Sequence, residues 1–195
     1  IKQMNMKQLS LIGRIVLLFA FALVFQAGAQ NVNLKTRSTQ IGINNEGYFS
    51  SIQVEGKDIL HTGKYPLVTA CTGNELVIPT KLTSSGNQLK LTMSDGGTIA
   101  LKHKESDVCI TLEVANIPDK YEVLLFGPLA VNINEVVGDV VGVAQGNGVA
   151  FGIQALNIKT NAGIPEEYGQ LVTQTYGYTG KSAELSVASM PDYKL

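Results

Sequence analysis

The chain has 195 residues, of which 45% are hydrophobic and 16% are charged, and its net charge is −1 at pH 7. This composition fits a packed, turn-rich β domain better than a disordered tail, and the lack of a Lys/Arg cluster argues against nucleic acid as a partner. The two cysteines and two histidines show no metal-ligand spacing, so we expect neither a metal site nor a cofactor.

The N-terminal segment is typical of a secretory signal peptide. Three basic residues, Lys2, Lys7 and Arg14, precede an unbroken apolar run at 15–25, and a small-residue cleavage motif ends at Ala29. The run has 11 residues, whereas a membrane-spanning helix needs about 20. The sequence therefore predicts export, cleavage after Ala29 and no permanent membrane anchor.

The remaining part, residues 30–195, has room for one domain. It keeps 12 basic and 16 acidic residues, which gives a net charge of −4. The chain begins with Ile1 rather than Met, and it stops at Leu195 without a closing feature. We therefore expect it to be a fragment of a longer reading frame.

Short runs rich in Val, Ile, Leu and Thr follow one another, separated by Gly, Asn, Asp and Ser. Turn signals at intervals of about eight to twelve residues favour a β-sandwich or barrel. The first predicted strands lie at 39–43, 48–55, 66–72 and 76–83.

The middle of the chain alternates regularly between apolar and polar residues. Leu89, Leu91 and Met93 alternate with polar residues, and the same pattern recurs at 99–104 and 108–114. A period of two places apolar side chains on one face of a strand, so these segments predict an antiparallel meander with one solvent-exposed (wet) face.

The segment 121–131 is apolar almost throughout, which predicts a strand buried on both faces with a bend or bulge at Gly127-Pro128. Strands predicted at 140–144 and 149–155 flank Gln145-Gly146-Asn147-Gly148, a hairpin turn signal. The polar stretch 157–180 predicts a long loop, and 182–188 a last strand. The expected fold is all-β, an antiparallel two-sheet β-sandwich preceded by a signal-peptide helix.

The two cysteines, Cys71 and Cys109, leave two interpretations open. In an exported protein they could form one disulfide, which would stabilise the fold by roughly 3–4 kcal/mol. Alternatively, they are two separate thiols that behave as small apolar side chains.

Two segments resemble a known family. Residues 41–60, IGINNEGYFSSIQVEGKDIL, resemble the opening hairpin of the galactose-mutarotase-like β-supersandwich, and residues 142–157, GVAQGNGVAFGIQALN, are similar to later strands of such domains. The resemblance covers roughly residues 39–157. It implies a non-catalytic N-terminal module of a secreted glycoside hydrolase, which packs on a catalytic domain that follows in the same chain and shapes one wall of its cleft.

Candidate catalytic groups are few. A mutarotase works with histidines and a carboxylate, but His61 lies at a turn edge and His103 lies in a strand between two lysines. Glu166 and Glu167 are adjacent, which suits a solvated loop better than the paired carboxylates of a glycosidase. We therefore predict no catalytic residue within this chain.

Glycan contact is the remaining candidate activity. Three tyrosines in the polar stretch, Tyr168, Tyr176 and Tyr178, could stack on sugar rings, although the spacing of Tyr176 and Tyr178 is more typical of two residues on one face of a short, half-buried strand. The functional prediction is a supporting module of an exported carbohydrate-degrading enzyme with a candidate glycan contact. The alternative is a stand-alone exported adhesion or interaction domain with an immunoglobulin-like sandwich. A small sugar epimerase would need His61 or His103 to face a carboxylate in a concave site.

Overall fold

The computed structural model describes residues 31–138, 142–157, 160–162, 177–178 and 183–189, so the predicted signal peptide at 1–29 lies outside it. In the described residues every regular element is a strand, and every strand pairing is antiparallel. The all-β, antiparallel prediction is therefore confirmed. The strands are distributed over four hydrogen-bonded sheets.

The first sheet is a meander in the order β1-β2-β3-β4. Its strands are β1 (Val32–Lys35), β2 (Thr39–Ile43), β3 (Phe49–Val54) and β4 (Lys57–Asp58). In the turn between β2 and β3, the Asn44 side-chain oxygen accepts hydrogen bonds from the N–H groups of Glu46 and Tyr48. Asparagine favours such turns because its side chain can bond to the backbone two residues on.

The second sheet has the order β10-β9-β8-β7. Its strands are β7 (Pro79–Ser85), β8 (Gln88–Met93), β9 (Thr98–Glu105) and β10 (Ile110–Asn116). Leu89, Leu91 and Met93 are buried and alternate with more exposed residues, which confirms the predicted meander with one wet face.

The third sheet runs β15-β17-β11-β5-β6, with β16 also on β17. Its strands are β5 (Val68–Thr72), β6 (Glu75–Val77), β11 (Val123–Val131), β15 (Thr160–Ala162), β16 (Gly177–Tyr178) and β17 (Ala183–Ser189). The pairing of β11 with β17 shifts register between Phe126 and Leu129, so the bulge predicted at Gly127-Pro128 is confirmed. Most of β11 is buried, as its continuous apolar sequence predicted.

The fourth sheet has the order β12-β13-β14, with β12 (Val136–Gly138), β13 (Val143–Gly146) and β14 (Val149–Gly152). Asn147 (φ 54°) and Gly148 (φ 78°) join β13 to β14. Positive φ at both central residues is the signature of a type I′ turn, and the hairpin that the turn signal predicted is confirmed.

Several predicted elements were wrong in extent. The strand predicted at 149–155 ends at Gly152, and Gln145 and Gly146, predicted as part of a turn, belong to β13. The predicted strand at 76–83 is divided at Ile78, because β6 pairs with β5 whereas β7 pairs with β8. The predicted loop at 157–180 contains two short strands, β15 and β16, which both pair with β17. In addition, β1, which was not predicted, pairs with β2 over four residues.

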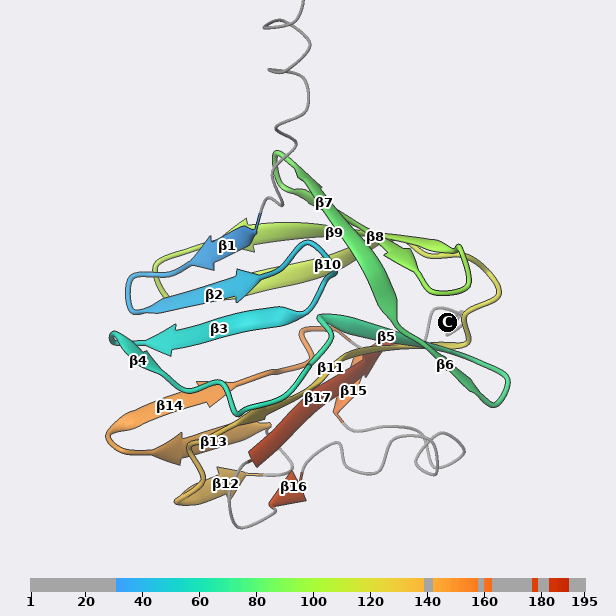
Figure 1. Ribbon diagram of the computed structural model, residues 1–195. Coiled ribbons are helices and arrows are strands. Elements are labelled where there is room, and N and C mark those ends of the chain that lie inside the picture. The colour runs from blue at the N-terminus through green and yellow to red at the C-terminus, as the bar shows by residue number, and fades with distance from the viewer. Residues whose placement is uncertain (1–30, 139–141, 158–159, 163–176, 179–182, 190–195) are drawn as a thin grey trace, which may run out of the picture. The chain divides into compact units, whose positions relative to one another are not determined.

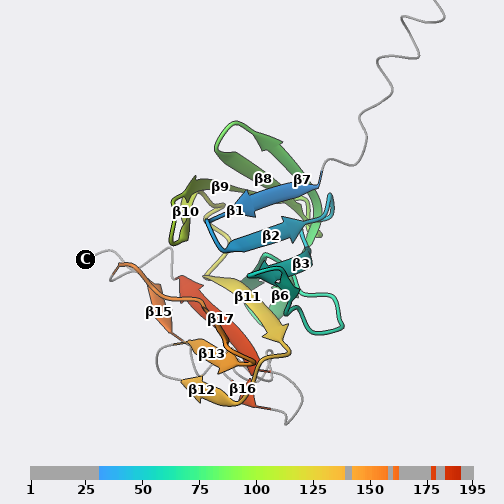
Figure 2. The ribbon, with the colours of Figure 1, turned by 90° about the vertical axis from the view of Figure 1, so that its left-hand side faces the viewer.

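Two apolar clusters hold the sheets together. The first is formed by residues of the first three sheets and includes Leu34 of β1, Leu91 of β8 and Leu124 of β11, while the second includes Ile52, Leu129 and Val131. Ile41 and Phe49 pack against both. In Figures 1 and 2 the β7–β10 sheet lies at the top of the view and the β12–β14 sheet at the bottom, with β11 between them. The described part of the chain contains no helix long and apolar enough to cross a membrane.

Candidate functional site

The structure describes the predicted glycan contacts only in part. Tyr168 and Tyr176 lie outside the described residues. Tyr178 ends β16, where its backbone pairs with Ala183 of β17. The glycan contact by the three tyrosines therefore stays a prediction.

The two cysteines are free thiols in different environments. Cys71 lies in β5 and is buried, and this burial, with a smaller contribution from Glu122, raises its pKa to about 11. Cys109 precedes β10 and is exposed. The structure thus shows the separate-thiol arrangement, in which Cys109 is the more accessible group.

The two histidines also lie apart. His103 belongs to β9, and its Nδ1 is 3.3 Å from Glu105 Oε1 without forming a hydrogen bond. His61 Nδ1 lies 3.0 Å from the carbonyl oxygen of Thr62 and 3.2 Å from the hydroxyl of Tyr65. Neither histidine is among the described residues that line the two concavities below. His103 thus faces a carboxylate, but not within either of these concavities, so the described residues do not meet the condition set for an epimerase.

The strongest electrostatic cluster surrounds Asp95 in the turn between β8 and β9. Its Oδ1 accepts hydrogen bonds from the buried Tyr121 hydroxyl (2.6 Å) and the Gly97 N–H (2.9 Å), while Oδ2 lies 2.8 Å from Lys120 Nζ. Burial opposes ionisation of Asp95, but the hydrogen bonds and charge of these partners outweigh it and lower its pKa to about 2. Burial and the Asp95 carboxylate raise the pKa of Tyr121. The cluster ties the turn to the segment before β11, so its role is structural.

This cluster predicts a specific acid response. Because the folded-state pKa of Asp95 lies below its ordinary value of 3.8, its stabilising effect is present above about pH 4 and is lost as pH falls towards 2. Between about pH 4 and pH 2, the ionised Asp95 should account for on the order of 1 kcal/mol of the free energy of unfolding that is lost, a value reduced for the 28% exposure of the side chain. We expect Asp95→Asn to abolish this part of the loss. Urea titrations at several pH values would measure it. The exposed Asp119, changed to Asn, is the control, and an equal effect of both variants would contradict the assignment.

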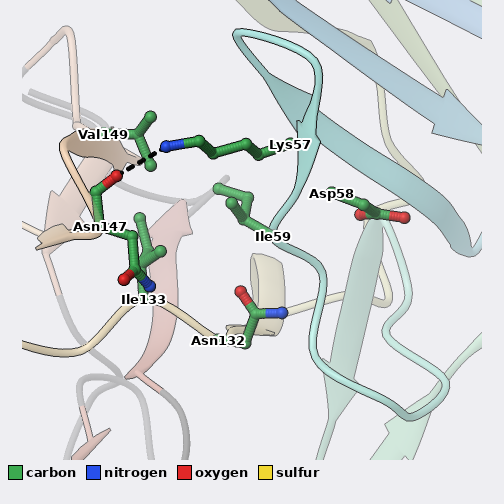
Figure 3. Close-up of a pocket in the computed structure, with 7 residues that line it drawn as sticks. All are labelled: Lys57, Asp58, Ile59, Asn132, Ile133, Asn147 and Val149. Carbon is green, nitrogen blue, oxygen red and sulfur yellow. Dashed lines mark hydrogen bonds between the residues drawn. The ribbon is translucent and has the colours of Figure 1, made fainter.

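Figure 3 shows a shallow pocket of about 480 Å³, here called the Lys57 pocket. The residues that line it are Lys57, Asp58, Ile59, Asn132, Ile133, Asn147 and Val149. Lys57 Nζ donates a 2.8 Å hydrogen bond to the backbone oxygen of Asn147, which joins β4 to the β13–β14 turn. The Asp58 carboxylate points away from this bond, and its Oδ1 accepts from the N–H groups of Ile52 and Leu60.

The Lys57 pocket offers limited chemistry. Its described lining contains one carboxylate, which the backbone of neighbouring residues engages, and no aromatic ring on which a sugar could stack. Within the part of the chain that the structure describes, no group of three or more His, Cys, Asp or Glu side chains could hold a metal ion. The pocket can therefore supply hydrogen bonds from Lys57 and Asn132, but not paired acid/base catalysis.

A larger concavity of about 840 Å³ lies between β10 and the chain that follows β13, and we call it the β10–β14 groove. One wall consists of β10, and the other of residues 150–157, which begin in β14. Side chains from β1, β2, β3 and β11 form the floor, including Ile41, Phe49 and Leu129. The groove therefore lies where the two apolar clusters meet.

The lining of this groove is predominantly apolar. Glu113 is its only charged side chain among the described residues. At its rim Val108 is 80% exposed and Leu156 is 71% exposed, two of the most exposed large apolar side chains in the described chain. Alternation in 108–114 indicated an apolar face on this strand, but the sequence did not indicate that the face borders a groove. An apolar concavity of this kind suits protein docking better than catalysis.

Comparisons with protein-family models, with curated proteins and with solved structures found no match for this chain.

Proposed function

We propose that this chain is the non-catalytic N-terminal module of an exported carbohydrate-degrading enzyme, with its sheets arranged as a two-layer, supersandwich-like domain. It is exported to the periplasm or the extracellular space by the signal peptide at 1–29. It supports a catalytic domain that follows in the same polypeptide. Its own contribution to glycan binding is small and involves Tyr168, Tyr176 and Tyr178.

The observation that carries this proposal is the β10–β14 groove. An enzyme site for glycoside hydrolysis needs two carboxylates on opposite sides of the scissile bond. The described groove lining instead combines one carboxylate, Glu113, with a broad apolar floor. This surface supports a role in packing against another protein domain, which is the role that the family resemblance implies.

The test begins with the nucleotide sequence downstream of the codon for Leu195. We expect it to encode a catalytic domain, and the protein from the complete reading frame should release sugars from one or more polysaccharides in a reducing-end assay. Substituting the acidic pair of that domain should abolish hydrolysis, whereas His61→Ala and His103→Ala should leave it nearly unchanged. A stop codon close to Leu195 would overturn the proposal and favour the stand-alone adhesion or interaction domain.

A further inference from the structure

The turn between β13 and β14 contains the only Asn-Gly pair of the sequence, Asn147-Gly148. In such a pair the backbone nitrogen of the glycine can attack the side-chain amide carbon of the asparagine, because glycine has no Cβ to hinder the approach. The products are a cyclic succinimide and ammonia. Both Asn147 and Gly148 are exposed, so water and solvent base reach the reacting groups.

Lys57 contacts the same peptide group that supplies the nucleophile. Its Nζ donates a 2.8 Å hydrogen bond to the backbone oxygen of Asn147, which belongs to the peptide bond between Asn147 and Gly148 (Figure 3). Resonance joins the oxygen and the nitrogen of one peptide group, so the anion that forms when the Gly148 N–H loses its proton carries charge on this oxygen. A cationic donor on that oxygen stabilises the anion. The contact therefore favours the form of Gly148 that attacks.

The fold, rather than the local sequence, creates this contact. Lys57 lies in β4 and is 90 residues away from Asn147 along the chain. The N–H of Asn147 donates a 2.9 Å hydrogen bond to Glu135 Oε1, which positions the turn through its preceding peptide group. The Lys57 ammonium thus meets the Asn147 oxygen only when the β1–β4 and β12–β14 sheets are folded.

A second turn of similar sequence provides a contrast. Asp95-Gly96 could form the same ring with loss of water. There, however, the Gly96 N–H donates a 3.0 Å hydrogen bond to the Met93 oxygen, and the Asp95 carboxylate is engaged by Tyr121 and Lys120. Both reacting groups are held in other interactions, so we expect this turn to stay unmodified.

We propose that Asn147 is a self-modification site, at which the Gly148 nitrogen closes a succinimide ring and Lys57 promotes the step. A bond forms between the Gly148 nitrogen and Asn147 Cγ, the bond from Cγ to Nδ2 breaks, and the proton lost by Gly148 leaves with ammonia. Water then opens the ring at either carbonyl, which gives aspartate or isoaspartate at position 147. Water is the only co-reactant.

Both products change the Lys57 pocket. The side chain of Asn147 lines this pocket, so either product replaces a neutral amide with a carboxylate in the same pocket as Lys57. Isoaspartate also adds a methylene group to the backbone of the turn, next to the pair Gly146↔Val149 that closes the hairpin. We expect the isoaspartate form to loosen β13 and β14 and to uncover Val149, which is 6% exposed in the unmodified chain.

The test is peptide mapping of the full chain by mass spectrometry during incubation in mildly alkaline buffer, with isoaspartate distinguished from aspartate. We expect conversion at position 147 and none at Asp95. Lys57→Met should slow the conversion about three- to tenfold, less than at a buried oxyanion site because water screens an exposed charge. Lys90→Met, at an exposed lysine of β8, is the matched control and should leave the rate unchanged.

Incubation in urea shows whether the fold carries the effect of Lys57. In the unfolded chain the contact is lost, so the wild type and Lys57→Met should convert at equal rates. Equal rates in the native state, or a faster rate in native Lys57→Met, would overturn the role of Lys57, because the hydrogen bond would then only hold the turn. Conversion in urea without conversion in the native chain would overturn the whole proposal.

Gly148→Ala examines the nucleophile itself. An added Cβ would meet no atom within 4 Å, so this variant should fold despite the positive φ of +78°. Its conversion should be at least about tenfold slower than that of the wild type, both in the native state and in urea, because the Cβ hinders the attacking nitrogen. An unchanged rate would show that ammonia is lost by direct hydrolysis of the amide and would overturn the ring closure.

Discussion

Replacing Gly47 with alanine is expected to destabilise the fold by about 3–5 kcal/mol. Gly47 lies in the turn between β2 and β3 with φ +94°, a conformation that residues with a Cβ rarely adopt. An added Cβ would lie 2.7 Å from Leu91 Cδ2 and 3.0 Å from Pro79 Cβ. Leu91 is fully buried and Pro79 is rigid, so neither atom can move away without disturbing the first apolar cluster.

Gly86→Ala separates the two contributions to that loss. Gly86 also has a positive φ, +57°, but an added Cβ there would meet no atom within 4 Å. We expect its loss to be only about 1 kcal/mol, from backbone strain alone. Urea unfolding of both variants would measure the difference, and equal losses would show that the contact with Leu91 and Pro79 does not matter.

Local signals in the sequence predicted the central strands well. β2 covers the residues predicted for it, and the burial of Leu89, Leu91 and Met93 follows the period of two. The hairpin around Asn147-Gly148 and a bend or bulge at Gly127-Pro128 were also predicted, because those residue types favour such backbone conformations wherever they occur. These features depend on a few neighbouring residues.

The features that the sequence did not predict depend on distant partners. The division at Ile78 arises because β6 and β7 belong to different sheets, and no local pattern specifies a sheet. β15 and β16 are too short to give a pattern of their own, and they are strands because β17 pairs with them. A segment with weak β propensity can form a strand when a neighbour supplies its hydrogen bonds.

The candidate site illustrates the same limit. Ile110, Leu112 and Val114 could be recognised as the apolar face of a strand, and they are partly buried against the first cluster. This face borders a groove because residues 150–157 lie opposite it. The sequence of residues 150–157 does not predict where that segment packs. The aromatic residues that the sequence did favour, Tyr168 and Tyr176, lie outside the described residues.

A final prediction concerns how the two apolar clusters are connected. β11 contributes Leu124 to the first cluster and Leu129 to the second, and both leucines are almost fully buried. Since Ile41 and Phe49 also pack against both clusters, the described sheets should unfold together. We expect Leu124→Ala and Leu129→Ala each to lower the free energy of unfolding by about 2–5 kcal/mol, from lost contacts and the remaining cavity.

The discriminating observation is the shape of the urea transition rather than its midpoint alone. If the clusters form one cooperative unit, both variants should show a single transition with an unchanged slope, because the surface exposed on unfolding is the same. Leu156→Ala, at a side chain that is 71% exposed, is the matched control and should shift the midpoint little. Two separate transitions in Leu129→Ala would instead show that the second cluster unfolds on its own. In that case β11 would be a linker between two independent cores rather than the strand that couples them.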